Sequence, residues 1–177
     1  MRWLPRHILP PPRPLRDARA PLWLAAIVLL LTAGLAEAAD KGPSVPRFVT
    51  LRADEVNLRT GPGERYPIEW VYTRKGLPVE VVAEYDVWRK IRDSQGTEGW
   101  VHQRMIAGNR SVIVRGQTPP LLSSPDPQSA VVARAEPGVI AKLLECQGPW
   151  CRIEAQDVRG WLRRSDLWGV YPDEDVR

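Results

Sequence analysis

The stretch "EVNLRTGPG" at residues 55–63 alternates apolar and polar side chains and then ends in a Gly-Pro-Gly turn. Successive side chains of a β-strand point to opposite faces, so the alternation predicts a strand with Val56 and Leu58 directed into a core. Asn57 and Arg59 then point outward. Glycine and proline at the end of the run favour a tight excursion of the chain. The stretch therefore predicts a half-buried strand that leads into a compact loop.

The sequence downstream of this strand occurs twice. Residues 75–91, "KGLPVEVVAEYDVWRKI", superpose without a gap on residues 137–153, "PGVIAKLLECQGPWCRI", and Trp88 falls on Trp150. The match continues from "EGWVHQRMIAG" to "RGWLRRSDLWG" at an offset of 61. Self-similarity at a fixed spacing indicates a repeated structural unit. The chain is therefore predicted to contain two copies of one module of roughly 60 residues.

Each copy consists of short apolar runs separated by turn residues about every 8 to 12 positions, which is typical of an all-β fold. In the first copy, we expect the chain to return to the fold near Ile68 after the Gly-Pro-Gly turn. We expect the second copy to repeat the pattern over residues 111–170. Trp100 and Trp161 follow a glycine in the last strand and are expected in the core. The elements expected in the first copy are strands at 48–51, 56–58, 79–84, 88–92 and 99–102, and a short helical turn at 103–105.

Residues 1–38 have the three-part pattern of a secretory signal. Five arginines precede the apolar run at 21–36, and the small-residue exit at 36–38 predicts cleavage before Ala39. A membrane span normally needs about 20 apolar residues, so retention as an anchor is the alternative interpretation. The mature chain is expected in the periplasm or outside the cell, with no stable membrane span.

The excess of basic residues belongs mostly to this export segment. The whole chain has 25 basic and 21 acidic residues, a formal net charge of +4. Without residues 1–38 the counts are 20 and 19, which leaves a net charge of +1. Nucleic-acid binding depends on a positive surface that neutralises phosphates. The charge balance of the mature chain therefore argues against a nucleic-acid partner.

The chain has two cysteines, Cys146 and Cys151, which enclose the turn-forming "QGPW". In an exported protein such a pair favours a disulfide across the base of a hairpin. Structural zinc takes four Cys or His ligands, and the mature chain offers only these two cysteines and His102. We therefore expect a disulfide, no metal site and no cofactor.

The ordered set "VNLRTGPG", a glycine before an apolar strand, "VWRKI" and "EGWV" resembles the bacterial SH3-like (SH3b) domain family over residues 47–108. The second copy keeps the later motifs but has "PLLSSPDPQS" in place of "VNLRTGPG", so it resembles a diverged member. The resemblance implies an all-β fold of two tandem, small, partly open barrels. The expected division is a signal peptide at 1–38, a linker at 39–46, a first domain at 47–109, a second domain at 110–171 and an acidic tail at 172–177.

The resemblance also implies an aromatic platform at Trp88, which either faces a ligand or is partly buried. Tyr66 is then a candidate for the other wall of a shallow groove. Asn57 either contacts the ligand or satisfies backbone groups of its own loop. Arg59 is either a ligand contact or a solvated strand charge. The counterpart Trp150 is expected to be structural because it lies beside the disulfide.

An enzyme is not expected. Nucleophilic catalysis needs a base beside a nucleophile, and the mature chain has one histidine, His102, which is interpreted as a surface residue. Both cysteines are assigned to the bridge. Adjacent carboxylates such as Asp54 and Glu55 face opposite ways on a strand.

Three functions remain open for a non-catalytic chain. The resemblance implies an exported binding module that contacts peptidoglycan peptides. The alternative is a periplasmic interaction or scaffold protein with no wall affinity, whose partner is another envelope protein. Recognition of proline-rich peptides ranks last, because "HQRM" stands where the eukaryotic relatives have the proline and tyrosine of their groove. The short apolar segment "AGNRSVIVRG" between the modules favours closely packed domains.

Overall fold

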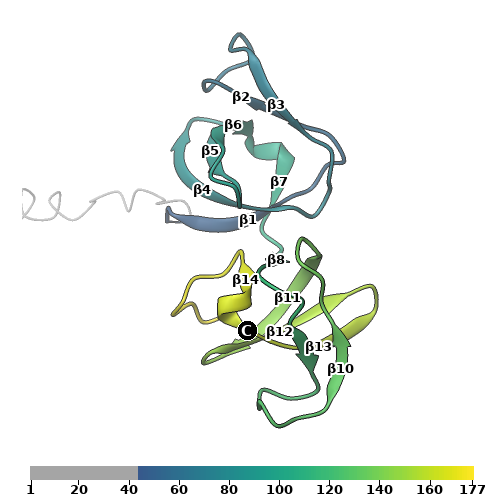
Figure 1. The fold of residues 1–177 in the computed structure, drawn as a ribbon. Helices are drawn as coiled ribbons and strands as arrows, with labels where there is room; N and C mark the ends of the chain where they lie inside the picture. The colour runs from purple at the N-terminus through teal and green to yellow at the C-terminus, as the bar shows by residue number, and fades with distance from the viewer. Residues whose placement is uncertain (1–43) are drawn as a thin grey trace, which may run out of the picture. The chain divides into compact units, whose positions relative to one another are not determined.

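The computed structural model describes residues 44–177 (Figure 1). The predicted signal peptide at 1–38 and residues 39–43 of the predicted linker lie outside the described residues. In residues 44–177, no helix has the length and apolar character needed to cross a membrane.

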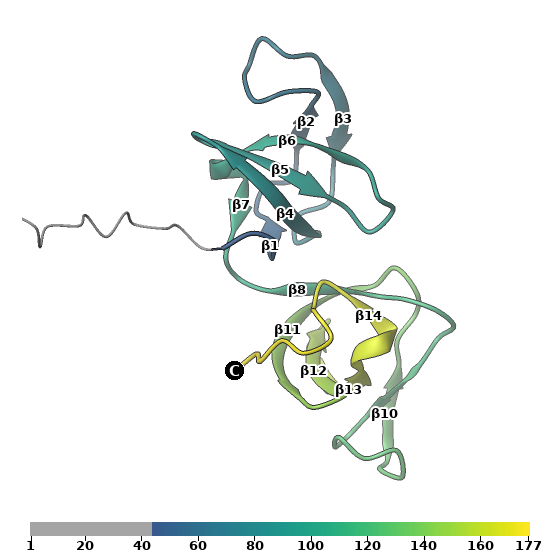
Figure 2. The same cartoon turned by 90° about the vertical axis from the view of Figure 1, so that its left-hand side faces the viewer.

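The first copy forms one antiparallel sheet with the order β3-β2-β6-β5-β4-β1-β7 (Figures 1 and 2). The expected strands and the expected helical turn are confirmed, whereas β3 and β7 were not predicted as strands. β3 lies at the edge of the sheet and is exposed along most of its length, so its sequence lacks an alternating pattern. The elements are β1 (Arg47–Leu51), β2 (Val56–Arg59), β3 (Ile68–Tyr72), β4 (Pro78–Tyr85), β5 (Trp88–Arg92), β6 (Glu98–His102), the 3₁₀ helix η2 (Gln103–Met105) and β7 (Ile106–Ala107).

The second copy forms a sheet with the equivalent order, β10-β9-β13-β12-β11-β8-β14. Each strand therefore has a counterpart in the first copy, and the expected tandem all-β architecture is confirmed. We call β1–β7 the first module and β8–β14 the second module. The elements are β8 (Ser111–Val114), β9 (Pro120–Leu122), β10 (Val131–Arg134), β11 (Ile140–Gln147), β12 (Trp150–Ala155), β13 (Val158–Arg163), the 3₁₀ helix η3 (Arg164–Asp166) and β14 (Leu167–Trp168).

Each module has its own apolar core. Val56 and Leu58 are fully buried in the first module, as the alternation of the opening stretch predicts. A Cβ atom at Gly99 would lie 2.6 Å from the Leu58 Cγ, so glycine is what allows β2 and β6 to cross closely. The equivalent contact in the second module joins Gly160 and Leu121, at 2.5 Å. These two contacts identify Leu121 as the counterpart of Leu58.

The expectation that Trp100 lies in the core is wrong. Side chains alternate along β6, and Val101 is the residue that points inward and is fully buried. Trp100 is therefore on the outer face and only half-buried. Trp161 is buried, with 7% of its surface exposed, but Leu162 takes the inward position in its strand and belongs to the core cluster of the second module.

Cys146 and Cys151 form the expected disulfide. The two residues are directly paired across β11 and β12, and both belong to the core cluster of the second module. The hairpin between these strands is thus closed by a covalent bond next to buried apolar side chains.

The two modules contact each other, as the linker sequence suggests. The hydroxyl groups of Thr50 and Ser111 lie 2.8 Å apart. The Tyr171 hydroxyl donates to a carboxylate oxygen of Glu80 at 2.8 Å. These bonds join strands of the first module to the start and end of the second.

Candidate binding site

A pocket of about 280 Å³ lies on the first module, where the start of β5, the end of β6 and the loop after β2 come together. We call it the Trp88 pocket. Three of the four candidate ligand residues, Asn57, Arg59 and Trp88, line it, and Tyr66 does not. Its lining residues are Glu55, Asn57, Arg59, Glu64, Trp88, His102, Arg104 and Met105.

Trp88 is mostly buried in this pocket, with 9% of its surface exposed. It follows a tight hairpin turn in which Asp86 has a φ of 50°, and it pairs with Tyr85 across that turn. Trp88 also pairs with His102 across β5 and β6, and the two rings meet edge to face with centroids 5.5 Å apart. The indole therefore offers an edge to a ligand while most of its surface stabilises the module.

His102 belongs to the pocket, although the sequence indicated only a surface residue. Its Nδ1 accepts a hydrogen bond from the Arg104 backbone N–H at 3.1 Å. An imidazole whose Nδ1 accepts a hydrogen bond carries its proton on Nε2, and this nitrogen makes no hydrogen bond in residues 44–177 and can donate to a ligand. Strand alternation, which places His102 on the outer face of β6 beside Trp88, was the signal that could have identified it.

Arg59 closes the loop after β2. Its Nη1 donates to the backbone carbonyls of Glu64 at 3.0 Å and Tyr66 at 2.8 Å. Arg59 is therefore not a freely solvated strand charge. Its Nη2 has no hydrogen-bond partner in residues 44–177, so the guanidinium keeps a free side for a ligand.

Tyr66 packs inside the same loop. A Cβ atom at Gly61 would lie 2.4 Å from the Tyr66 ring, so the ring lies directly on the glycine backbone. The Arg65 guanidinium covers the ring at 5.4 Å from its centroid. The Tyr66 side chain thus packs against the Gly-Pro-Gly loop and stabilises its conformation.

The Asn57 amide makes no hydrogen bond within the described part of the chain, so the expected bonds to backbone groups of its loop are not found. The side chain is half-buried and lines the pocket. An amide has two donor hydrogens and one acceptor oxygen. Asn57 therefore presents an unused set of hydrogen-bonding groups at the pocket.

The charges around the Trp88 pocket are mixed. Glu55 and Glu64 are acidic, Arg59 and Arg104 are basic, and His102 adds a polar ring. Such a lining suits a ligand that carries both signs of charge rather than a polyanion. In residues 44–177, no group of three or more His, Cys, Asp or Glu side chains is arranged to hold a metal ion.

The second module has a pocket of about 270 Å³ at the equivalent place, with different chemistry. Arg59 pairs with Trp100 across β2 and β6, and Leu122 pairs with Trp161 across β9 and β13. Leu122 therefore occupies the position of Arg59. The lining residues are Pro120, Leu122, Pro127, Ser129, Val131, Trp150, Arg163 and Asp166. Pro120 and Leu122 replace the polar pair, so the equivalent pocket is more apolar.

Two small β-modules of one topology, each with a tryptophan pocket at the same place, define a tandem small-barrel protein. The chain belongs to the bacterial SH3 domain family, whose model matches residues 52–108 and 116–169. Both copies are matched, including the diverged second one. The resemblance noted from the sequence motifs is thereby confirmed for the whole tandem.

A curated relative and two solved structures are similar to the chain. "Putative N-acetylmuramoyl-L-alanine amidase YrvJ" from Bacillus subtilis (strain 168) is 23% identical over 147 residues, which are 77% of this chain and 28% of that protein. NlpC2 and NlpC1 from Trichomonas vaginalis each match at 10% identity and a TM-score of 0.34. The alignments cover 76% of this chain and 52% of NlpC2, and 73% of this chain and 48% of NlpC1. At these values the likeness to the two structures carries no information on function.

Proposed function

We propose that this chain is an exported, non-catalytic binding protein of the bacterial cell envelope whose first module contacts peptidoglycan peptides through the Trp88 pocket. The observation that carries the proposal is the convergence of an indole edge, unused hydrogen-bonding groups and charges of both signs in one pocket. Wall peptides combine free carboxylates, amino groups and small apolar side chains, and each of these has a complement in the lining.

The complementary contacts follow from the chemistry of the lining residues. Arg59 keeps a free side that suits a bidentate contact with a peptide carboxylate. Glu55 and Glu64 suit an ammonium group. The Trp88 edge buries a small apolar side chain at little entropic cost because the ring is already held.

The family and the curated relative support the envelope part of the proposal. The name of the relative refers to the bond between N-acetylmuramic acid and L-alanine, which links the glycan to the peptide in peptidoglycan. This chain spans 28% of that protein, so the shared part is smaller than the relative. The lining of the Trp88 pocket includes no serine, threonine or cysteine that His102 could activate, which supports binding rather than catalysis.

Sedimentation of the exported protein with purified sacculi tests the proposal. Asn57→Ala is the most informative variant, because the amide makes no hydrogen bond within the described chain and its loss therefore breaks none there. We expect about a tenfold loss of retention for one lost hydrogen-bonding group in a desolvated site. Gln95→Ala is the matched control, since it removes an exposed amide in another loop. Equal retention of all three proteins would remove Asn57 from the site, and no retention would refute wall binding.

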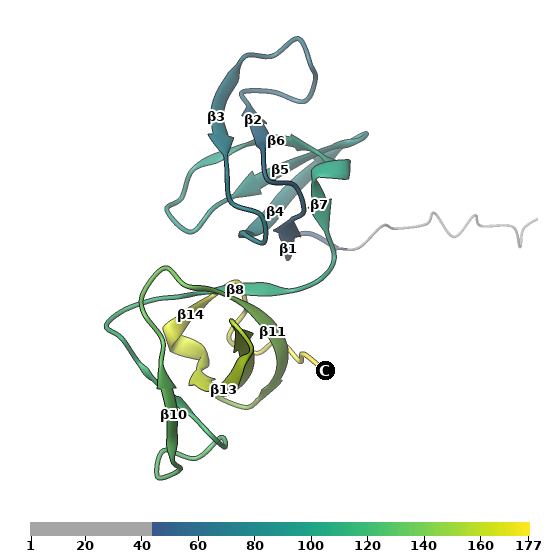
Figure 3. The same cartoon turned by 90° about the vertical axis from the view of Figure 1, so that its right-hand side faces the viewer.

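The edge strand β3 favours the second candidate function, a scaffold role without wall affinity. Trp70 is 57% exposed and Ile68 is 47% exposed on this strand, which has a free edge in the first sheet (Figure 3). An exposed apolar edge is typical of a surface that pairs with a strand of another protein. A protein that the wild type captures from periplasmic extract, and that the Trp70→Lys variant does not capture, would support this role. Capture that survives Trp70→Lys would argue against it.

A further inference from the structure

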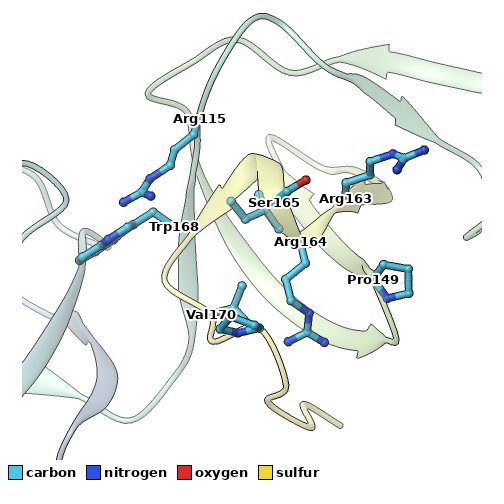
Figure 4. A pocket seen from close by; sticks show the side chains of 9 residues that line it. Arg115, Pro149, Arg163, Arg164, Ser165, Trp168 and Val170 are labelled. Carbon is cyan, nitrogen blue, oxygen red and sulfur yellow. The ribbon is translucent and has the colours of Figure 1, made fainter.

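We propose that the second module has a separate binding site for a carboxylate attached to a small apolar group, at a pocket lined by Arg115 and Trp168 (Figure 4). The pocket has a volume of about 470 Å³, within the range that holds small organic ligands. We call it the Arg115 pocket. It is distinct from the Trp88 pocket of the first module, and it shares only Arg163 with the pocket beside Trp150.

The charge of the Arg115 pocket is entirely positive. Arg115, Arg163 and Arg164 line it, and none of its lining residues is acidic. Glu174 lies nearby, but its two carboxylate oxygens accept hydrogen bonds from Nη1 and Nη2 of Arg110. Arg164 is close enough to Glu174 for their charges to interact, whereas Arg115 makes no ion pair within residues 44–177. A concave site lined by cations attracts an anion and raises its local concentration.

Arg115 is the residue best placed to bind that anion. Its guanidinium lies over the Trp168 ring at 5.6 Å from the centroid (Figure 4). Its side chain makes no hydrogen bond or ion pair within residues 44–177. The Arg115 backbone N–H donates to the Asp166 carbonyl at 2.7 Å, which anchors the residue beside η3. The cation–π contact uses none of the guanidinium N–H groups, so these can still make two parallel bonds to a carboxylate.

Arg164 has a different task in the same pocket. Its Nη1 donates to the carbonyls of Tyr171 and Glu174, and its Nε and Nη2 donate to the Gly148 carbonyl. Arg164 thus connects the C-terminal segment to the turn between β11 and β12, and its side chain forms one side of the Arg115 pocket. It supplies positive charge to the pocket, but it has little capacity left for direct hydrogen bonds.

The apolar part of the lining specifies the rest of the ligand. Leu167 and Val170 line the pocket and are almost completely buried, and two prolines, at 149 and 172, also line it. These side chains offer no hydrogen bonds, so they suit a methyl-sized or slightly larger apolar group. A carboxylate next to such a group is what a peptide presents when its last residue is small and apolar.

The Arg115 pocket is specific to the second module. The gap-free match of the last strands aligns Trp168 with Ala107, and Arg163 and Arg164 with His102 and Gln103. The first module therefore lacks the aromatic ring over which the Arg115 guanidinium lies. The site is a property of the diverged copy and does not depend on whether the Trp88 pocket binds the wall.

A nuclear magnetic resonance titration of the exported protein with N-acetyl-alanyl-alanine tests the inference. The probe carries a free carboxylate beside a methyl group, and its C-terminal amide is the matched neutral probe. We expect the acid, and not the amide, to shift the Trp168 indole N–H and the Arg115 Nε–H signals. For a ligand of this size we expect a dissociation constant on the order of 1 mM.

Two variants sharpen the test. Arg115→Gln should weaken binding of the acid at least tenfold, because it removes the bidentate contact. Arg134→Gln is the control, since Arg134 is an exposed arginine of β10 outside the Arg115 pocket and its loss changes the net charge equally. Equal shifts with the amide, no shifts at all, or full binding by Arg115→Gln would each overturn the site.

Discussion

The Trp88 indole and the His102 imidazole meet edge to face, with ring centroids 5.5 Å apart, because the two residues pair directly across β5 and β6. The hydrogen bond from the Arg104 backbone to His102 Nδ1 fixes the imidazole from its other side. This wall of the Trp88 pocket is therefore ordered before a ligand binds, which lowers the entropic cost of binding.

Trp88→Ala should weaken binding to wall peptides about thirtyfold, because truncating an aromatic anchor commonly costs about 2 kcal/mol. Trp150→Ala, at the equivalent place in the second module, should leave that affinity unchanged. Titration of both variants with soluble peptidoglycan peptides measures this. Since Trp88 is 9% exposed, its loss should also reduce the free energy of unfolding, so circular dichroism must first show a folded variant. A folded Trp88→Ala protein with wild-type affinity would contradict the site.

Gly61→Ala should destabilise the first module by about 1 to 3 kcal/mol, because the new Cβ atom would overlap the Tyr66 ring. Urea denaturation measures the loss. In the double variant Gly61→Ala with Tyr66→Ala the overlap disappears, so the two effects should not add. Strict additivity would show that Tyr66 does not hold the loop.

Reduction of the disulfide between Cys146 and Cys151 should lower the free energy of unfolding of the second module by about 2 kcal/mol, the value that chain entropy gives for a short loop. Denaturation curves of the oxidised protein and of the double variant to serine provide the comparison. The number of thiols labelled under non-reducing denaturing conditions is the control. Two labelled thiols before reduction would mean that the bridge is absent from the protein in solution.

Stability should fall in acid partly through Glu174. Burial alone would raise the pKa of this carboxyl, but the hydrogen bonds from Arg110 and from the Tyr171 N–H, together with the charges of Arg110 and Arg164, outweigh burial and lower the pKa. The unfolded chain then binds the proton more readily, so this contribution is present above the ordinary glutamate pKa of about 4.3 and is lost as pH falls through the lower folded value.

Thermal unfolding of the wild type and of Glu174→Gln between pH 6 and pH 3 measures this effect. The variant lacks the titrating group, so its melting temperature should fall less steeply below about pH 4 than that of the wild type. Parallel curves would show that Glu174 has the same pKa in the folded and unfolded chains.

The sequence was most informative where one face of a strand is buried. Alternation assigned Val56 and Leu58 to the core, and the repeated glycine identified the second copy. Trp100 was predicted in the core because a tryptophan is large and apolar. The alternation along β6 instead places Val101 inward and Trp100 on the outer face. The edge strand β3 escaped prediction because most of its residues are exposed and no alternating pattern results.

The sites depend on contacts between segments far apart in the sequence, and no local pattern encodes these. His102 joins the Trp88 pocket through the pairing of β5 with β6. The Arg115 pocket combines the residue that follows β8, residues of the 3₁₀ helix η3 and β14, and residues after β14. Arg59 was expected to be a ligand contact or a solvated charge, yet its main bonds are to the carbonyls of its own loop.

Chemical-shift mapping with soluble peptidoglycan peptides on the isotope-labelled protein tests the central claim most directly. Binding at the Trp88 pocket should shift the Trp88 indole N–H, the Asn57 side-chain amide and the His102 ring signals together, and should leave Trp70 on β3 unchanged. Shifts confined to Trp70 and its neighbours, or no shifts at peptide concentrations of several millimolar, would contradict the proposal that the first module binds wall peptides through the Trp88 pocket.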